Sequence, residues 1–225
     1  MVCELKYEIK KLLDSQQGLE VDKKGKEYII QGLYKYSLDY NGCITQGKRE
    51  IKLVVQDDFP NSIPKLYISN YPEHIEHIYA DGNVCLATTG EMIYFLNENP
   101  SLISFINRFV NSFIYTLDWF DKYKTYPFGD RKHGYRGSID YYLNDLKLTE
   151  SQYKKMVWMI LNDKYRGHTL CICKSGKKLR NCHGKYILPI IKNDLYKREF
   201  LHEAYNILIK DGKNVQKKIH KIMIL

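Results

Sequence analysis

The spacing of apolar residues predicts a helix followed by strands in the first part of the chain. Residues 4–17 carry an apolar stripe at helical spacing, and Gly18 is suited to end that helix. Residues 28–40 are rich in Ile, Tyr and Leu, and Asn41-Gly42 after them is typical of a hairpin turn. Short apolar runs at 51–55 and 65–69, separated by Asp57-Asp58-Phe59-Pro60, predict further strands.

Helical periodicity returns in the second half of the chain. Asn99-Pro100 has the residue types of a helix start, with Asn as the N-cap and Pro at the first helical position. The expected helix buries a stripe made of Leu102, Ile106, Phe109, Phe113 and Leu117. Residues 125–138 contain three glycines and are expected to be irregular. Thr149-x-x-Gln152 matches the capping box of a further helix, and a last helix is expected near 194–209.

Composition restricts the class of protein. The 225 residues are 44% hydrophobic, which is enough for a packed core. The chain has no run of about 18 apolar residues, and its start lacks the pattern of a signal peptide, so we expect a cytoplasmic protein. Six cysteines in such a chain favour metal binding or catalysis over disulfides.

The net charge of +9 is unevenly distributed. Residues 1–150 hold 18 Lys and Arg against 21 Asp and Glu, whereas residues 151–225 hold 17 against 5. This change in charge suggests a boundary between a first domain at 1–147 and a basic helical tail at 148–225. A basic tail favours an acidic protein surface or nucleic acid as partner, and it is equally what an ordinary solvated surface looks like.

The tail also contains a closely spaced set of metal-ligand residues. Cys171-x-Cys173 is followed, after eight residues, by Cys182-His183-Gly184, with a Ser-Gly turn between the two pairs. Three thiolates and one imidazole can close a tetrahedral structural zinc site, and four protein ligands leave no open position for catalysis. The pattern closely resembles the SEC-C motif, a zinc knuckle at the end of the translocase motor SecA, where the resemblance implies a role in protein contact.

A second motif surrounds Cys85. The stretch His77-Ile-Tyr-Ala-Asp-Gly-Asn-Val-Cys85-Leu86 follows Phe59-Pro-Asn-Ser-Ile-Pro64, and the two together resemble the active-site region of ubiquitin-conjugating enzymes. The order of expected elements over residues 4–120 also resembles that family. The resemblance implies an α+β fold with helices flanking an antiparallel sheet, and a thioester carried on Cys85. The alternative for Cys85 is a buried cysteine on a strand.

Two histidines are candidates for assisting the thiol. In ubiquitin-conjugating enzymes an Asn of a His-Pro-Asn tripeptide stands eight residues before the Cys, and here that position holds His77. His77 could donate a hydrogen bond to the oxyanion, take a proton from the incoming amine, or only stabilise the loop. The missing Asn also leaves open that the activity is lost. His133 is a candidate general base, the alternative being an ordinary surface loop.

Residues 127–137, which contain His133-Gly134, resemble a loop of bacterial ubiquitin-conjugating-like proteins found in CBASS-type anti-phage operons. This resemblance implies a thioester transferase whose partner is a protein with a conjugatable C-terminus, such as a cyclic-nucleotide synthase. The chain shows no nucleotide-binding Gly-rich loop of its own. A separate activating enzyme and a self-contained transfer both remain open.

Two other functions compete with conjugation. The first is a non-catalytic adaptor, in which the fold binds a protein and the zinc tail docks an acidic surface. The second is nucleic-acid or ribosome binding by the basic tail. Asp118 and Asp121 could position an attacking lysine, but nothing in the sequence selects them.

Overall fold

The α+β architecture expected from the sequence is present in the computed structural model, which describes residues 2–71, 78–79, 81–127 and 135–210. The chain divides into two compact units. The first comprises Met1–Leu86 and Glu98–Arg131, and the second comprises Ala87–Asn97 and Lys132–Leu225. The boundary suggested at 147/148 lies inside the second unit, because residues 87–97 and the segment before 147 pack with the C-terminal helices.

The first unit is built on a four-stranded antiparallel sheet in sequential order. Its strands are β1 (Leu19–Lys24), β2 (Glu27–Tyr40), β3 (Cys43–Gln56) and β4 (Lys65–Ile68). The predicted hairpin is confirmed: Tyr40 pairs with Cys43, and Asn41 and Gly42 form the turn with φ of 55° and 80°. Positive φ at both positions is the geometry of the two-residue turns that match the twist of paired strands.

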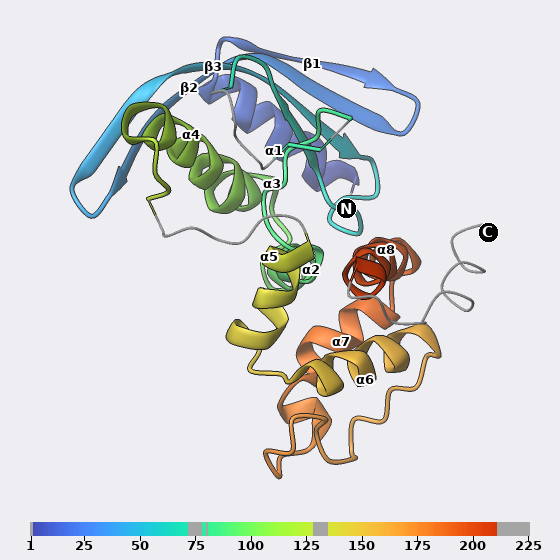
Figure 1. Cartoon of the computed structure of the whole chain (residues 1–225). Helices are drawn as coiled ribbons and strands as arrows, with labels where there is room; N and C mark the ends of the chain where they lie inside the picture. Colours follow the sequence, from blue (N-terminus) through green and yellow to red (C-terminus); the bar gives the residue numbers. More distant parts are fainter. Residues whose placement is uncertain (1, 72–77, 80, 128–134, 211–225) are drawn as a thin grey trace. The chain divides into compact units, whose positions relative to one another are not determined.

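One face of the sheet is buried and the other is exposed. Residues on the buried face include Tyr28, Ile30 and Tyr34 of β2 and Ile51, Leu53 and Val55 of β3. Helices α1 (Val2–Ser15) and α4 (Asn111–Tyr123) both lie below the sheet in Figure 1. The opposite face presents Lys48, Glu50 and Lys52 to solvent. This period-two alternation is what an antiparallel sheet with one covered face requires.

The long helical segment of the first unit runs as α3 (Leu102–Phe105), a π-helical turn η1 (Ile106–Val110) and α4. Its predicted apolar stripe is buried. The predicted N-cap is wrong: Ser101 caps the helix, accepting a hydrogen bond from the Ser104 amide. The Glu8 carboxylate of α1 accepts hydrogen bonds from the Ser101 hydroxyl and the Leu102 amide, which fixes the helix start at this point.

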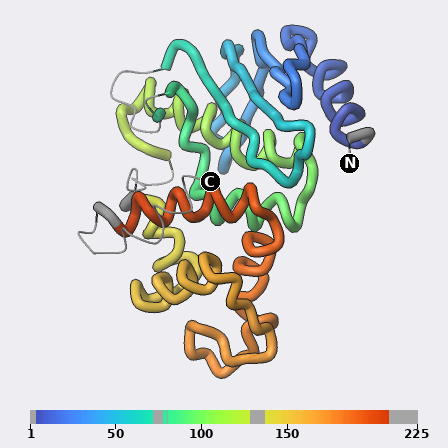
Figure 2. Tube along the Cα trace, turned by 90° about the vertical axis from the view of Figure 1, so that its right-hand side faces the viewer, coloured from blue at the N-terminus to red at the C-terminus, as the bar shows by residue number. Residues whose placement is uncertain are grey.

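The second unit is helical. It contains α2 (Thr89–Glu98), α5 (Tyr135–Asp140), a π-helical turn η2 (Tyr141–Asp145), α6 (Glu150–Leu161), a 3₁₀ turn η3 (Leu179–Asn181), α7 (Gly184–Ile191) and α8 (Asp194–Lys210). Helices α5, α6 and α7 each contact α8, the long red helix of Figure 2. The predicted capping box at the start of α6 is confirmed, with Thr149 and Gln152 each bonding the other's backbone.

A carboxylate on α8 holds α2 within this unit. Glu203 accepts hydrogen bonds from the Thr89 amide at 2.9 Å and from the Tyr142 hydroxyl at 2.8 Å. Burial raises the pKa of Glu203 above its ordinary value. Tyr142 is itself fully buried and packs so close to Gly90 that a Cβ at Gly90 would lie 2.5 Å from the Tyr142 hydroxyl oxygen.

Within the described residues, no helix has both the length and the apolar character needed to cross a bilayer.

Candidate metal centre and thiol loop

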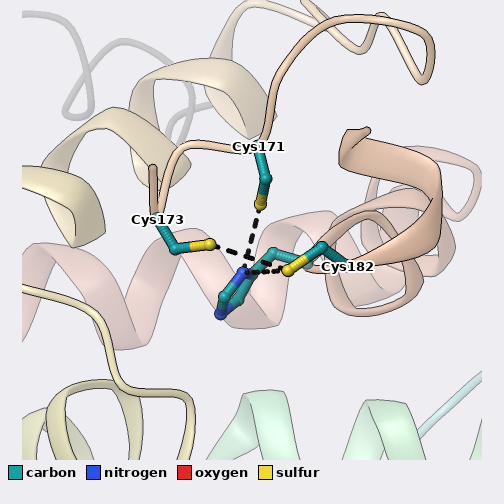
Figure 3. Close-up of side chains that lie close together, drawn as sticks. Cys171, Cys173 and Cys182 are labelled. Atoms are coloured by element: carbon teal, nitrogen blue, oxygen red, sulfur yellow. Dashed lines mark hydrogen bonds between the residues drawn. The ribbon is translucent and has the colours of Figure 1, made fainter. Parts of the chain in front are cut away.

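Four side chains from two short segments converge in the second unit. Their ligand atoms, three sulfurs and one ring nitrogen, all lie within 4.8 Å of one another. His183 Nδ1 is 3.2 Å from Cys171 Sγ and 3.3 Å from Cys182 Sγ. Cys173 Sγ is 3.6 Å from Cys182 Sγ. The three cysteines point toward one common point in Figure 3. The four predicted ligands are therefore brought together, and they could hold a metal ion.

The distances can be compared with those of a tetrahedral site. Zn–S bonds of about 2.3 Å and Zn–N bonds of about 2.0–2.1 Å place two sulfur ligands about 3.8 Å apart, and a sulfur and a nitrogen about 3.5 Å apart. The separations of 3.6 Å between Cys173 and Cys182, and of 3.2 and 3.3 Å to His183, are slightly shorter. The residues present fit an ion of this size at their centre.

A backbone carbonyl orients the imidazole. His183 Nε2 lies 2.8 Å from the Leu146 carbonyl oxygen. A carbonyl oxygen only accepts, so Nε2 carries the proton and donates it, which leaves the lone pair on Nδ1 toward the cysteines. Metal-binding histidines are typically fixed in this way by a partner on their other nitrogen. His183 is also buried, so the ring has little freedom to turn.

The turn between the ligand pairs has the conformation that the Ser-Gly pair suggested. Lys174 and Gly176 have φ of 61° and 76°. The Lys174 amide donates to the Cys171 carbonyl, and the Cys171 amide donates to the Lys177 carbonyl at 2.9 Å. These bonds close a tight loop that returns the chain to Cys182. Gly176 accepts the left-handed conformation without a Cβ penalty.

As thiols, the cysteines ionise unequally. Burial raises the pKa of Cys171 to about 11. Burial acts in the same direction on Cys173, but hydrogen bonds with Ser175 and with the neighbouring thiols outweigh it and lower the pKa of Cys173 to about 6. The surroundings thus favour the thiolate of Cys173 and disfavour that of Cys171. A divalent cation at the centre would favour all three thiolates together.

Sequence reasoning identified the ligands but not the groups that position them. The Leu146 carbonyl lies 37 residues before His183, and a backbone acceptor has no residue-type signature. The Ser175 hydroxyl is 3.2 Å from Cys173 Sγ and 3.7 Å from Cys182 Sγ. The sequence indicates Ser175 only as part of a turn, whereas its hydroxyl contacts two of the ligand sulfurs.

Cys85 lies in the first unit, directly after a tight turn beside the edge strand β4. The Val84 amide donates to the Leu66 carbonyl at 2.8 Å, which ties the loop to β4. Asp81 accepts a hydrogen bond from the Asn83 amide, and Gly82 has φ of 80°. Val84 is 4% exposed, whereas Cys85 is partly exposed and lies outside any strand. The alternative of a buried cysteine on a strand does not describe this position.

The other candidate catalytic residues fall differently. His77 and His133 lie outside the residues that the structure describes. Asp118 on α4 accepts hydrogen bonds from Arg49 Nη2 and from Thr45 Oγ1, both at 2.6 Å, in a half-buried ion pair against the β2–β3 hairpin. Asp118 thus joins helix to sheet. Asp121 forms an exposed pair with Lys124 at 3.4 Å.

Comparison with protein-family models, with curated proteins and with solved structures finds no match to this chain. The likenesses to ubiquitin-conjugating enzymes and to the SEC-C motif therefore stay hypotheses based on short motifs. The four-residue cluster and the position of Cys85 are independent of both likenesses.

Proposed function

We propose that this protein carries the C-terminus of a partner protein as a thioester on Cys85 and transfers it to an amine, as ubiquitin-conjugating enzymes do. The observation that carries the proposal is the position of Cys85: a partly exposed thiol follows a buried Val84 in a turn bonded to an edge strand. A thioester carrier needs an accessible thiol on a rigid support. The one-sided antiparallel sheet with its flanking helices is consistent with the same family.

The reaction has two steps. The Cys85 thiolate attacks the carbonyl carbon of an activated C-terminus, an acyl-adenylate or a thioester, and expels AMP or a thiolate as the Cys85 thioester forms. An amine of the acceptor then attacks that carbonyl, loses its proton, and expels the Cys85 thiolate as an amide forms. His77 is the proposed partner of the second step, as oxyanion donor or base, and His133 is a further candidate base.

We further propose that the metal is zinc and that its role is structural. Three thiolates with one imidazole form a ligand set that suits zinc, and four protein ligands close the tetrahedron. Such a site supplies folding free energy to a segment with a small core of its own. Metal analysis of the purified protein should give one zinc per chain, and Cys182→Ser should lower that content. A wild-type protein purified without zinc, and unchanged by Cys182→Ser, would contradict the proposal.

The test of Cys85 is covalent capture in cells that carry the neighbouring genes. The wild-type protein should form an adduct that disappears on a gel run with reductant. Cys85→Ser and Cys85→Lys should convert the adduct to an ester or an amide, which resist thiols. The matched control is Cys43→Ser, because Cys43 lies in the same unit and is exposed, whereas Cys85 is partly exposed. It should leave the adduct unchanged.

Loss of the adduct in Cys43→Ser, or an adduct of Cys85→Ser that still disappears with reductant, would contradict the assignment. If Cys85→Ala keeps full biological activity, the adaptor function replaces the enzyme. The partner expected from the motif at 127–137 is a cyclic-nucleotide synthase in anti-phage defence, and mass spectrometry of the captured adduct identifies it directly.

A further inference from the structure

A groove of about 690 Å³ opens at the metal centre, within the second unit. Two segments line it, one at 145–147 and the other at 173–186, and three of the four metal ligands reach its surface. Its volume lies within the range of about 300–1,000 Å³ that is usual for ligand sites. The groove is therefore large enough for several side chains of a bound peptide.

The charged side chains around this groove are mostly basic. Lys147, Lys177, Arg180 and Lys185 line it and are exposed, and Asp145 is the acidic residue among its lining. A divalent ion with three thiolates adds only one further negative charge. A surplus of positive charge thus remains after the metal centre is counted. The basic residues exceed what neutralising the centre requires.

One of these cations is held in a fixed position. Lys185 Nζ lies 3.3 Å from the Tyr94 hydroxyl oxygen and about 5 Å from the ring centres of both Tyr94 and Tyr186. The two rings contact each other with centroids 4.5 Å apart. This arrangement keeps a positive charge at one wall of the groove.

The same contacts decide between two classes of acidic partner. Single-stranded nucleic acid is usually held by aromatic faces on which bases stack, together with a basic track along the backbone. The aromatic faces beside this groove are occupied by each other and by Lys185. The four cations line a single concavity. The carboxylates of an acidic peptide match the lysine ammonium groups and the planar fork of Arg180 without needing a free aromatic face.

We propose that this groove binds an acidic segment of a partner polypeptide, through carboxylates that pair with Lys147, Lys177, Arg180 and Lys185. The site is separate from the thioester chemistry proposed for Cys85, because the two lie in different units and share no residue. Loss of one function therefore does not predict loss of the other.

Fluorescence anisotropy of the full chain with a fluorescein-labelled hexaglutamate peptide tests the proposal. The peptide should bind, and hexaglutamine should not. The double variant Lys177→Glu with Arg180→Glu should weaken binding by about tenfold or more, because each attraction becomes a repulsion. The matched control, Lys155→Glu with Lys164→Glu, makes the same change in net charge outside the groove and should weaken binding by less than about threefold.

Metal content is measured in every variant, so that an effect on the metal centre is recognised. If the charge reversals reduce it, the neutral pair Lys177→Gln with Arg180→Gln takes their place and should still weaken binding. Equal weakening in both double variants would overturn the proposal in favour of unspecific attraction. Failure of hexaglutamate to bind would also overturn it. So would tighter binding of a six-nucleotide single-stranded DNA that is lost in the groove variant, since that result assigns the groove to phosphates.

Discussion

Gly184→Ala should weaken metal binding, although helix propensity alone predicts the opposite. Gly184 is the first residue of α7, where alanine would ordinarily favour the helix by about 1 kcal/mol. A Cβ at Gly184 would, however, lie 2.6 Å from the Leu179 carbonyl oxygen and 2.6 Å from the Tyr165 hydroxyl oxygen. Ordinary contacts begin at 3.4 Å, so each neighbour would need to move by about 0.8 Å.

The two neighbours differ in how easily they can move. The Tyr165 hydroxyl is at the end of a side chain and can turn away. The Leu179 carbonyl is backbone and accepts a hydrogen bond from the Cys182 amide at 3.0 Å. Relief of the clash must therefore shift either Leu179 or the start of α7, and these segments carry Cys182 and His183. Overpacking of this kind costs about 1–3 kcal/mol, which corresponds to about a 5- to 150-fold loss of metal affinity.

Competition with a chromogenic chelator measures the metal affinity of the purified variant. The control is Gly25→Ala in the first unit, where a Cβ has open space but φ is 59°. That change strains a turn far along the sequence from the ligands and should lower stability without changing metal affinity. Metal affinity in Gly184→Ala equal to or above that of the wild type would refute the reasoning. It would mean that helix propensity outweighs the close approach to Leu179.

Two further predictions concern ionised groups outside the metal centre. Asp118→Asn should lower the free energy of unfolding in urea by about 2 kcal/mol, because it leaves Arg49 half-buried without its anion. Asp121→Asn, in an exposed pair, should change this free energy by less than about 0.5 kcal/mol. Similar effects of the two substitutions would show that burial does not set the difference. For Glu203, burial raises the pKa above 4.5, so its contribution to stability is full below pH 4.5 and falls as the pH rises through the folded value. Glu203→Gln lacks this titration, so its unfolding free energy relative to wild type should rise between pH 4 and pH 7, and a constant difference would contradict the raised pKa.

The parts of the molecule that the sequence predicted well depend on short-range information. The metal ligands lie within residues 171–183, and their residue types restrict the chemistry before any fold is known. The Asn41-Gly42 hairpin and the Thr149–Gln152 capping box are likewise decided by residues a few positions apart. The apolar stripes of the long helices give burial correctly because a period of 3.6 residues defines one face.

The parts that were missed depend on residues far apart in the sequence. Helix α2 follows the Cys85 loop directly, and the sequence did not predict it. It belongs to the second unit, where the Glu203 carboxylate, 114 residues later, accepts a hydrogen bond from the Thr89 amide. Asn99 was predicted as a cap on local grounds. Ser101 takes that role because Glu8, more than 90 residues earlier, binds the start of the helix. No local pattern could have identified either carboxylate.

The metal cluster and Cys85 also differ in how far their local residues determine their chemistry. A cluster of three thiols and one imidazole defines its own chemistry, because the ligands themselves select the ion. The reactivity of Cys85 instead depends on what surrounds a single thiol, and its loop is fixed by backbone bonds to Leu66 and Tyr79 within the first unit. None of these bonds involves a residue of the metal centre. Loss of the metal therefore removes no partner of these bonds, and a variant that loses its metal should still form the thioester adduct proposed for Cys85.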